Sequence, residues 1–219
     1  MWDLPTRLFH WSIVLLVGVL WYTGKTGGLD EMTIHMWAGY AVLALLLFRL
    51  AWGVIGTRSS RFAEFVRGPV SAFRYARGLA RREKRPVVGH NPLGGWMVVL
   101  LLISLLVQTM SGLFADDEIF TTGPLAGKVS GEVVSFMTWV HDGNFNLLLA
   151  LAAVHVTAVL LYRFVLRDNL IRPMITGRKV VPADTGVEGV RFAASWLAVL
   201  LSLLAAAAVY GLVFVYGSG

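Results

Sequence analysis

The chain contains no cysteine among its 219 residues. This absence excludes iron–sulfur clusters bound by thiolates, disulfides and covalently attached c-type haem. Any redox centre must therefore be held by histidine or by other ligands that are not thiolates. Charged residues are also scarce, at 15% of the chain, where a soluble domain would carry about 25%.

The chain is instead rich in apolar residues. Apolar residues make up 57% of the chain, and the mean hydropathy is +0.69. A helix that crosses a bilayer needs about 20 mostly apolar residues, and five segments satisfy this requirement. We therefore expect an all-α integral membrane helical bundle. The five segments run from about Phe9 to Thr23, Thr33 or His35 to Val54, Leu93 to Phe114, Val133 to Phe164, and Phe192 to Tyr216. The fourth is longer than a bilayer requires, so it should be tilted or project from the surface.

The connecting segments differ strongly in charge. Nine basic residues lie between the second and third apolar segments, and six lie from Arg163, at the end of the fourth, to Arg191, whereas the opposite side has only Lys25 and Lys128. Cytoplasmic loops collect Lys and Arg, so we expect a cytoplasmic N-terminus and a periplasmic C-terminus. This asymmetry also accounts for the net charge of +6 without nucleic-acid binding, which we do not expect. The acidic residues of the opposite side are Asp30, Glu31, Asp116, Asp117, Glu118, Glu132 and Asp142.

The five apolar segments predict that the chain folds as two parts. Residues 1–166 would form a four-helix core that includes a basic cytoplasmic link over residues 57–91. Residues 167–219 would add a second link and a fifth transmembrane helix. Within the first link, Ser59 to Arg85 combines basic residues with Phe62, Phe65 and Phe73. This pattern suggests an amphipathic helix on the inner leaflet.

Four of the five histidines occupy membrane-helix positions. His141 and His155 lie 14 residues apart on the fourth segment, which is about 21 Å along a helix with a rotation of about 40°. With the topology set by loop charge, His10 and His155 lie toward the cytoplasm, and His35 and His141 lie toward the outside. Two layers of paired imidazoles fit two stacked bis-histidine haems.

Alternative roles for these histidines differ in the partners that they require. A single histidine is equally explained by a hydrogen bond across the bundle. Zinc requires clustered tetrahedral ligands, and a proton relay would need carboxylates deep in the helices. Neither pattern is present in the sequence. Haem iron needs two axial ligands beside an apolar slot. Small residues suit such a slot and also suit close helix packing: Gly18, Gly39, Ala150, Ala152 and Ala153.

Several motifs in order carry a family resemblance. They are WDLPTRLFHW from Trp2 to Trp11, His35 with WAGY, FRLAWGVIGTRSSRF from Phe48 to Phe62, GHNPLGGW from Gly89 to Trp96, TGPLA from Thr122 to Ala126, and the fourth-segment histidine pair. Over about residues 2–166 the chain resembles the bacterial cytochrome b561 family, which includes the cytochrome b subunits of nickel–iron hydrogenases. The resemblance says less about the fifth helix.

The resemblance implies a four-helix core with two b-type haems, one near each membrane face. It implies that His10 and His155 ligate the inner haem iron and that His35 and His141 ligate the outer one. Similar proteins exchange electrons between the quinone pool and a redox partner. In the hydrogenase and formate dehydrogenase relatives, quinone lies near the cytoplasmic haem beside an asparagine that starts a helix, and Asn91 is similar in placement.

Five further residues are candidates for cofactor contacts. His90 is either a structural turn residue or a hydrogen-bond partner for quinone, since histidine changes charge near neutral pH. Arg49 lies well inside an apolar segment and must reach an anion, either a haem propionate or the lipid headgroups. Arg7, Arg58 and Arg61 are candidates for propionate contacts, although positive-inside placement also explains them.

The expected function is electron transfer across the bacterial inner membrane. A di-haem cytochrome would connect the quinone pool with a periplasmic redox partner, either a cytochrome c or a hydrogenase-like subunit. The acidic outer residues would suit a basic partner, although charge asymmetry alone explains them equally, and a fifth helix weakly favours a partner. The alternative is a stand-alone oxidoreductase that passes electrons from superoxide to quinone. A haem-free transporter or assembly factor is a third class.

Overall fold

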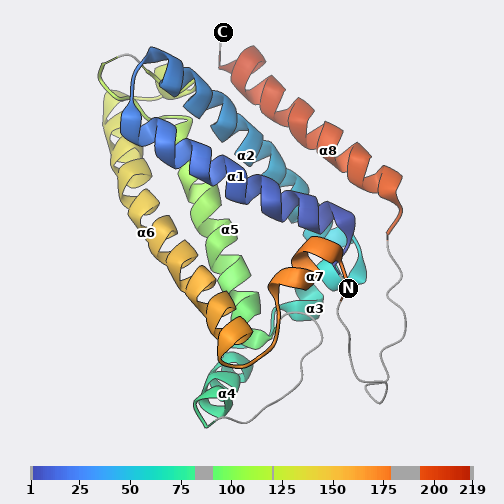
Figure 1. The fold of residues 1–219 in the computed structure, drawn as a ribbon. Coiled ribbons are helices and arrows are strands. Elements are labelled where there is room, and N and C mark those ends of the chain that lie inside the picture. The colour runs from blue at the N-terminus through green and yellow to red at the C-terminus, as the bar shows by residue number, and fades with distance from the viewer. Residues whose placement is uncertain (1, 82–90, 120, 179–192, 218–219) are drawn as a thin grey trace.

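The computed structural model describes residues 2–81, 91–119, 121–178 and 193–217. Five helices in this part of the chain are long and apolar enough to cross a membrane (Figure 1). They confirm the expected all-α, multi-pass architecture. These helices are α1 (Leu4–Thr26), α2 (Leu29–Ile55), α5 (Pro92–Gly112), α6 (Gly131–Phe164) and α8 (Ser195–Tyr210), which a π-helical turn continues over Gly211–Tyr216.

Polar caps extend the helices beyond their apolar segments. The Asp3 carboxylate accepts a hydrogen bond of 2.9 Å from the Thr6 amide, so α1 begins at Leu4 rather than at Phe9. Asn91 caps α5 in the same way, through a bond of 2.7 Å from the Gly94 amide. A side-chain oxygen at this position satisfies an amide that would otherwise lack a partner.

The turn between α1 and α2 depends on glycine. Gly27 and Gly28 have φ angles of 66° and 99°, a region that residues with a Cβ rarely adopt. The two glycines let the chain reverse within a few residues. As a result α1 and α2 form an antiparallel hairpin, and α1 packs against α2.

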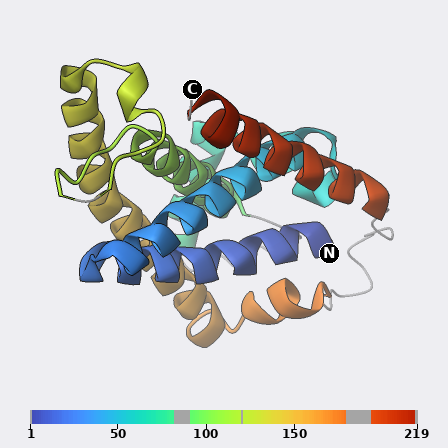
Figure 2. The same ribbon diagram turned by 90° about the horizontal axis from the view of Figure 1, so that it is seen from above.

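The helices pack around α2, whose side chains Val42, Leu46 and Trp52 are almost fully buried. Besides α1, α2 contacts α5 and α8. Figures 1 and 2 show α8 on the side of α2 that faces away from α6. In α6, which is described over all 34 residues, Leu148 is the one buried residue. The long α6 packs mainly on α5, and its other inward face is turned toward α1 and α2.

The basic link does not form the single amphipathic helix that the sequence suggested. The described part divides into a 3-10 turn (Arg58–Ser60), α3 (Phe62–Phe65) and α4 (Pro69–Ala80). Pro69 starts α4 because proline is tolerated in the first turn of a helix but not in its interior. The expectation of one continuous helix is therefore wrong for residues 59–81, and residues 82–85 lie outside the described residues.

The two ends of the bundle have different character. We call the end where α1 begins and α6 terminates the basic end, which also carries α3, α4 and α7 (Ile171–Thr176). We call the other end, with the loop over residues 113–130, the acidic end. Figures 1 and 2 place α7 beside the start of α1. There Trp11 Nε1 donates a hydrogen bond of 3.1 Å to the Met174 carbonyl.

Candidate functional site

The four helix histidines face each other in two pairs. His10 of α1 and His155 of α6 have ring centres 6.4 Å apart at the basic end. His35 of α2 and His141 of α6 have ring centres 6.3 Å apart toward the acidic end. These are the pairs expected from helix depth. Since α6 packs on α5, the space between α6 and the α1–α2 hairpin contains both pairs.

The separation of the rings indicates what fits between them. A ring nitrogen lies about 1.1 Å from the centre of an imidazole whose C–N bonds are about 1.33 Å long. Two imidazoles joined by a direct hydrogen bond would have centres about 5 Å apart. With a metal ion about 2 Å from each nitrogen, the centres would lie about 6 Å apart. Both observed separations match a single metal atom between two facing imidazoles.

A cavity of about 870 Å³ surrounds the pair at the acidic end. His35, His141 and Gly39 line it together with apolar side chains such as Leu105 and Leu148. The volume is in the range that holds small ligands and cofactors. A group of three or more metal-binding side chains, as zinc would need, is absent from the described residues. The cavity therefore suits a planar cofactor with a metal at its centre.

The hydrogen bonds of the acidic-end pair determine which ring nitrogens are free to bind a metal. His141 Nδ1 lies 2.9 Å from the backbone carbonyl oxygen of Gln108. This oxygen can only accept a hydrogen bond, so Nδ1 carries the hydrogen. His35 Nδ1 lies 3.1 Å from Thr23 Oγ1, and the Thr23 hydroxyl donates to the Val19 carbonyl at 2.8 Å. In a neutral imidazole the other nitrogen, Nε2, is then the free electron-pair donor.

Two glycines make room for these rings. A Cβ on Gly112 of α5 would lie 2.8 Å from His141 Cε1, and a Cβ on Gly24 of α1 would lie 3.2 Å from His35 Cε1. A Cβ on Gly39 would meet nothing within 4 Å, in keeping with its place on the cavity wall. Gly39 was among the slot residues suggested by sequence, whereas Gly24 and Gly112 were missed because their partners lie on other helices.

A polar ladder joins α5 to α6 beside His141. Asn144 Nδ2 donates to Gln108 Oε1 at 2.7 Å, and Gln108 Nε2 donates to the His141 carbonyl at 2.9 Å. Ser104 Oγ adds a bond of 3.2 Å to Asn144 Oδ1. These residues were not predicted from the sequence. Their signal was the presence of Gln and Asn well inside apolar segments, where polar groups require partners.

The pair at the basic end has a different environment. His10 Nδ1 is buried and has no hydrogen-bond partner among the described residues. The His10 ring instead makes an edge contact with Trp11, at 5.0 Å between ring centres. The orientation of this imidazole is therefore set by packing rather than by a hydrogen bond.

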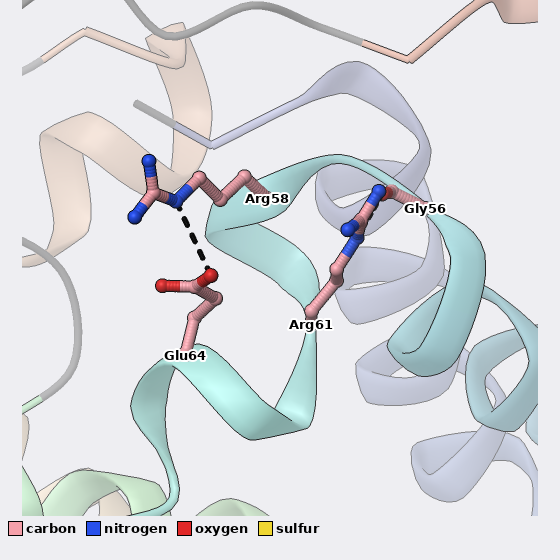
Figure 3. Close-up of polar contacts among 4 residues, drawn as sticks. All are labelled: Gly56, Arg58, Arg61 and Glu64. Atoms are coloured by element: carbon pink, nitrogen blue, oxygen red, sulfur yellow. Dashed lines mark hydrogen bonds and ion pairs between the residues drawn. The ribbon is translucent and has the colours of Figure 1, made fainter.

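Three of the arginines suggested as propionate contacts bind groups of this chain. Arg58 Nε donates to Glu64 Oε1 at 3.2 Å, and Arg61 Nε donates to the Gly56 carbonyl at 2.8 Å (Figure 3). Arg7 Nη1 donates to the Ile175 carbonyl at 2.6 Å. Each contact leaves other N–H groups of the guanidinium, so the propionate role stays a prediction.

Arg49 is only 3% exposed, and its guanidinium carbon lies 4.7 Å from the centre of the Phe62 ring. Asp3 is the carboxylate that interacts with it electrostatically. A carboxylate of the chain itself thus supplies an anion that Arg49 needs. One of its Nη atoms is buried without a hydrogen-bond partner among the described residues.

Asp3 is the centre of a buried polar network that joins α1, α2 and the 3-10 turn. Its Oδ2 accepts hydrogen bonds from Trp52 Nε1 at 2.9 Å and from Ser60 Oγ at 3.0 Å. Burial raises the pKa of Asp3, but hydrogen bonds from Thr6, Thr57 and Trp52 outweigh burial, so the pKa falls below its ordinary value. The carboxylate therefore stays ionised at neutral pH.

Of the two expected quinone residues, Asn91 lies at the basic end, where it caps α5. His90 falls outside the described residues. Asn91 Nδ2 donates a hydrogen bond of 2.8 Å to the Tyr162 hydroxyl, and that hydroxyl lies 3.0 Å from the hydroxyl of Tyr75. Neither tyrosine was predicted from the sequence, because only the fold brings α4, α5 and α6 together.

The mouth of the acidic-end cavity is charged. Lys25 lines it, and so do Asp116, Asp117 and Glu118. Lys25 is the one cation among the residues that line this cavity, and it was not predicted from the sequence as a cofactor contact. A carboxylate of a bound cofactor that reached this mouth would meet one favourable charge in a mostly acidic setting.

The fold and the paired imidazoles define a class of protein, namely a helical membrane protein that holds a metal cofactor between its helices. Comparison with known proteins narrows the class. A family model described as prokaryotic cytochrome b561 matches residues 1–177, and the chain belongs to this family. It is therefore a membrane b-type cytochrome, which binds haem b and transfers electrons.

Individual relatives agree with this assignment. The chain is 26% identical to proteins described as probable Ni/Fe-hydrogenase B-type cytochrome subunits from Azotobacter chroococcum and Azotobacter vinelandii, over 84% of this chain and 89% of each relative. A protein of the same description from Cupriavidus necator is 25% identical, over 80% of this chain and 84% of the relative. No solved structure matches the chain.

Proposed function

We propose that this cytochrome holds two haem b groups and carries electrons across the inner membrane between quinone and a periplasmic redox partner. The observation that carries the proposal is the presence of two imidazole pairs, with ring centres 6.4 Å and 6.3 Å apart. Each pair has the spacing for one iron. The positive-inside rule gives the orientation, with the basic end and the N-terminus in the cytoplasm and the C-terminus in the periplasm.

The protein's own residues then have distinct tasks. His10 and His155 hold the inner iron, and His35 and His141 hold the outer iron. When bound, the haems supply the one-electron chemistry. Helix α6 sets the distance between the two sites, since His141 and His155 are about 21 Å apart along its axis. Both sites lie within the hydrophobic bundle, which limits access of water.

Quinone exchange is assigned to the cytoplasmic end. Asn91 lies there at the start of α5, and its side chain is hydrogen bonded to Tyr162. Tyr162 is on the same helix as His155, so a quinone bound beside Asn91 would lie close to the inner haem. The similar placement of an asparagine in quinone-reactive relatives of this family supports the same location.

The periplasmic partner is proposed to be a hydrogenase-type subunit, with a cytochrome c as the second choice. The names of the relatives support the first choice. The mouth of the outer cavity carries Asp116, Asp117 and Glu118 against Lys25. This mainly negative rim favours a partner with a basic surface and disfavours superoxide, which is an anion. The charge pattern thus argues against the stand-alone superoxide enzyme.

Haem stoichiometry combined with a redox titration tests the proposal. The purified chain should contain two b-type haems and titrate with two midpoint potentials, and a quinol should reduce both haems. One haem per chain would contradict the two-site assignment. A protein expressed with sufficient haem that shows no reducible b-type band would overturn the proposal entirely.

A further inference from the structure

Three polar side chains from separate helices meet at the basic end. They are Tyr75 of α4, Asn91 at the start of α5, and Tyr162 of α6. Asn91 Nδ2 donates to the Tyr162 hydroxyl at 2.8 Å, and the two tyrosine hydroxyls are 3.0 Å apart. All three side chains are partly buried. The cluster lies at the basic end, where α4 and the N-cap of α5 meet the last turn of α6.

The donors and acceptors of this cluster do not balance. A hydroxyl has one hydrogen and two acceptor positions, and Asn91 is a donor to Tyr162. If Tyr75 donates to Tyr162, both acceptor positions of Tyr162 are filled and its hydrogen remains for another acceptor. If Tyr162 donates to Tyr75, the remaining hydrogen is that of Tyr75. In either arrangement one phenolic hydrogen has no acceptor within the cluster.

The Asn91 amide fills one acceptor position of the Tyr162 oxygen, and the exchange of donor and acceptor between the two tyrosines decides which of them presents the remaining hydrogen. The Asn91 carbonyl oxygen is bonded to the Gly94 amide at 2.7 Å, so the cap of α5 fixes the direction of its NH₂ group. This group always approaches the Tyr162 oxygen as a donor. Asp168, which follows α6, interacts electrostatically with Tyr162. In the arrangement in which Tyr75 donates to Tyr162, a ligand with a carbonyl oxygen would accept the Tyr162 hydrogen.

Tyr162 is well placed relative to the inner histidine pair. It follows His155 by seven residues, which is about 10 Å along α6 with a rotation of about 20°. Side chains on a helix lean toward its N-terminus, which for α6 is the direction of His155. A ligand that touches the Tyr162 hydroxyl would therefore lie between this tyrosine and the level of the inner haem.

We propose that Tyr162 donates a hydrogen bond to a carbonyl oxygen of the bound quinone, and that Tyr75 and Tyr162 relay a proton between that oxygen and cytoplasmic water. This inference rests on the proposed quinone function. Asn91 is a positioning residue, because it acts on the quinone through Tyr162.

The relay conserves protons and electrons. Reduction of a quinone to a quinol consumes two protons and two electrons, and a haem held by His10 and His155 would supply the one-electron chemistry. Tyr162 gives its proton to the quinone oxygen that it touches and takes one from Tyr75, which takes one from water. Both tyrosines end as they began. The second proton reaches the opposite quinone oxygen from water at the membrane surface, and quinol oxidation runs the same steps in reverse.

Kinetics of the full-length haem protein test this assignment. The variants Tyr162→Phe and Tyr75→Phe remove one hydroxyl each, and Tyr210→Phe on the exposed face of α8 is the matched control. The measurements are the rate of haem reduction by a short-chain quinol, its KM and kcat, its pH profile and its ratio in H₂O and D₂O. Haem content and the potentials found by chemical titration report on folding.

Tyr162→Phe should lower kcat by about 100-fold, since proton transfer by a positioned group contributes at least that much. Tyr75→Phe should lower kcat by about tenfold and reduce the solvent isotope ratio. Haem content, the haem potentials and the Tyr210→Phe control should be unchanged. Asn91→Asp keeps the oxygen that caps α5 but removes the donor to Tyr162, so it should also slow the reaction.

Two results would refute the inference in distinguishable ways. Wild-type rates and pH profiles in both tyrosine variants would remove the tyrosines from the reaction and leave the proposed function intact. A wild-type protein with both haems that exchanges no electrons with quinol would refute the quinone function itself. If Tyr162→Phe loses haem, the Asn91→Asp kinetics decide: an unchanged isotope ratio and rate overturn the relay.

Discussion

His35 and His141 face each other across the outer cavity with ring centres 6.3 Å apart and ring planes at 72°. Each ring is anchored through Nδ1, by Thr23 in one case and by the Gln108 carbonyl in the other. Both rings therefore leave the same nitrogen, Nε2, free for a ligand. Such anchoring sets ligand orientation and basicity in metal sites.

Replacement of single histidines should separate the two sites. His35→Ala or His141→Ala should remove the outer haem and spare the inner one, because these rings face each other. His10→Ala or His155→Ala should do the reverse. Haem content and the number of redox transitions of each purified variant provide the measurement. Loss of both haems from all four variants would show that the sites do not form independently.

Gly112→Ala should weaken the outer site specifically. The added methyl group would lie 2.8 Å from His141 Cε1, which forces the ring to shift and disturbs its bond to Gln108. A shift of this kind should lower haem affinity about 10-fold or more, measured by titration of the haem-free protein. Gly143→Ala on the same α6 helix as His141 meets nothing within 4 Å and should bind haem normally. Equal affinities of the two variants would contradict the close approach.

Thr23→Val should test the anchor of His35. Valine matches the shape of threonine but cannot accept the hydrogen from His35 Nδ1. Loss of a partner of this type lowers metal affinity by about 10–100-fold. The outer haem potential should also rise, because a less basic imidazole stabilises ferric iron less. Thr23→Ser retains the hydroxyl and should resemble the wild type in both measurements. Matching values for the valine and serine variants would exclude the hydroxyl as an anchor.

Asp3→Asn should destabilise the basic end in a pH-dependent way. The substitution keeps the shape but removes a buried charge that accepts bonds from Trp52 and Ser60, at a cost of about 1–3 kcal/mol at pH 7. The pKa of Asp3 is lower in the folded protein, so its stabilisation is present above about pH 4 and is lost as the pH falls through the folded pKa. Thermal unfolding in detergent should therefore show a gap between wild type and variant that narrows below about pH 4. A constant gap would mean that the charge of Asp3 makes no contribution.

The sequence predicted best those features that depend on a single segment of the chain. A bilayer requires long apolar helices, so all five helices were found and only their ends were misjudged, as where the Asp3 cap starts α1 at Leu4 rather than at Phe9. The histidine pairs were also accessible, since helix periodicity and loop charge assign each ring a face and a depth. Pro69 in the basic link could have predicted the start of a separate helix. The amphipathic pattern of the whole link instead suggested one continuous helix.

The partners of the functional side chains were not accessible in this way. Gly24 beside His35, Asn144 beside Gln108, and Tyr75 beside Tyr162 are pairs between different helices. Helix periodicity states which face a residue occupies but not which residue of another helix it meets. The expected role of Arg49 shows the same limit, because its proximity to Asp3 arises only when the start of α1 packs on the end of α2.

The sequence by itself determined that this protein is a membrane bundle with two layers of histidine, because apolar length, charge asymmetry and a 14-residue spacing are properties of single segments. Only the tertiary structure decided the distance between the imidazoles, the hydrogen bonds that orient two of them, and the cluster of Tyr75, Asn91 and Tyr162. Those features depend on the packing of helices against one another, and packing is set by side-chain shapes across interfaces.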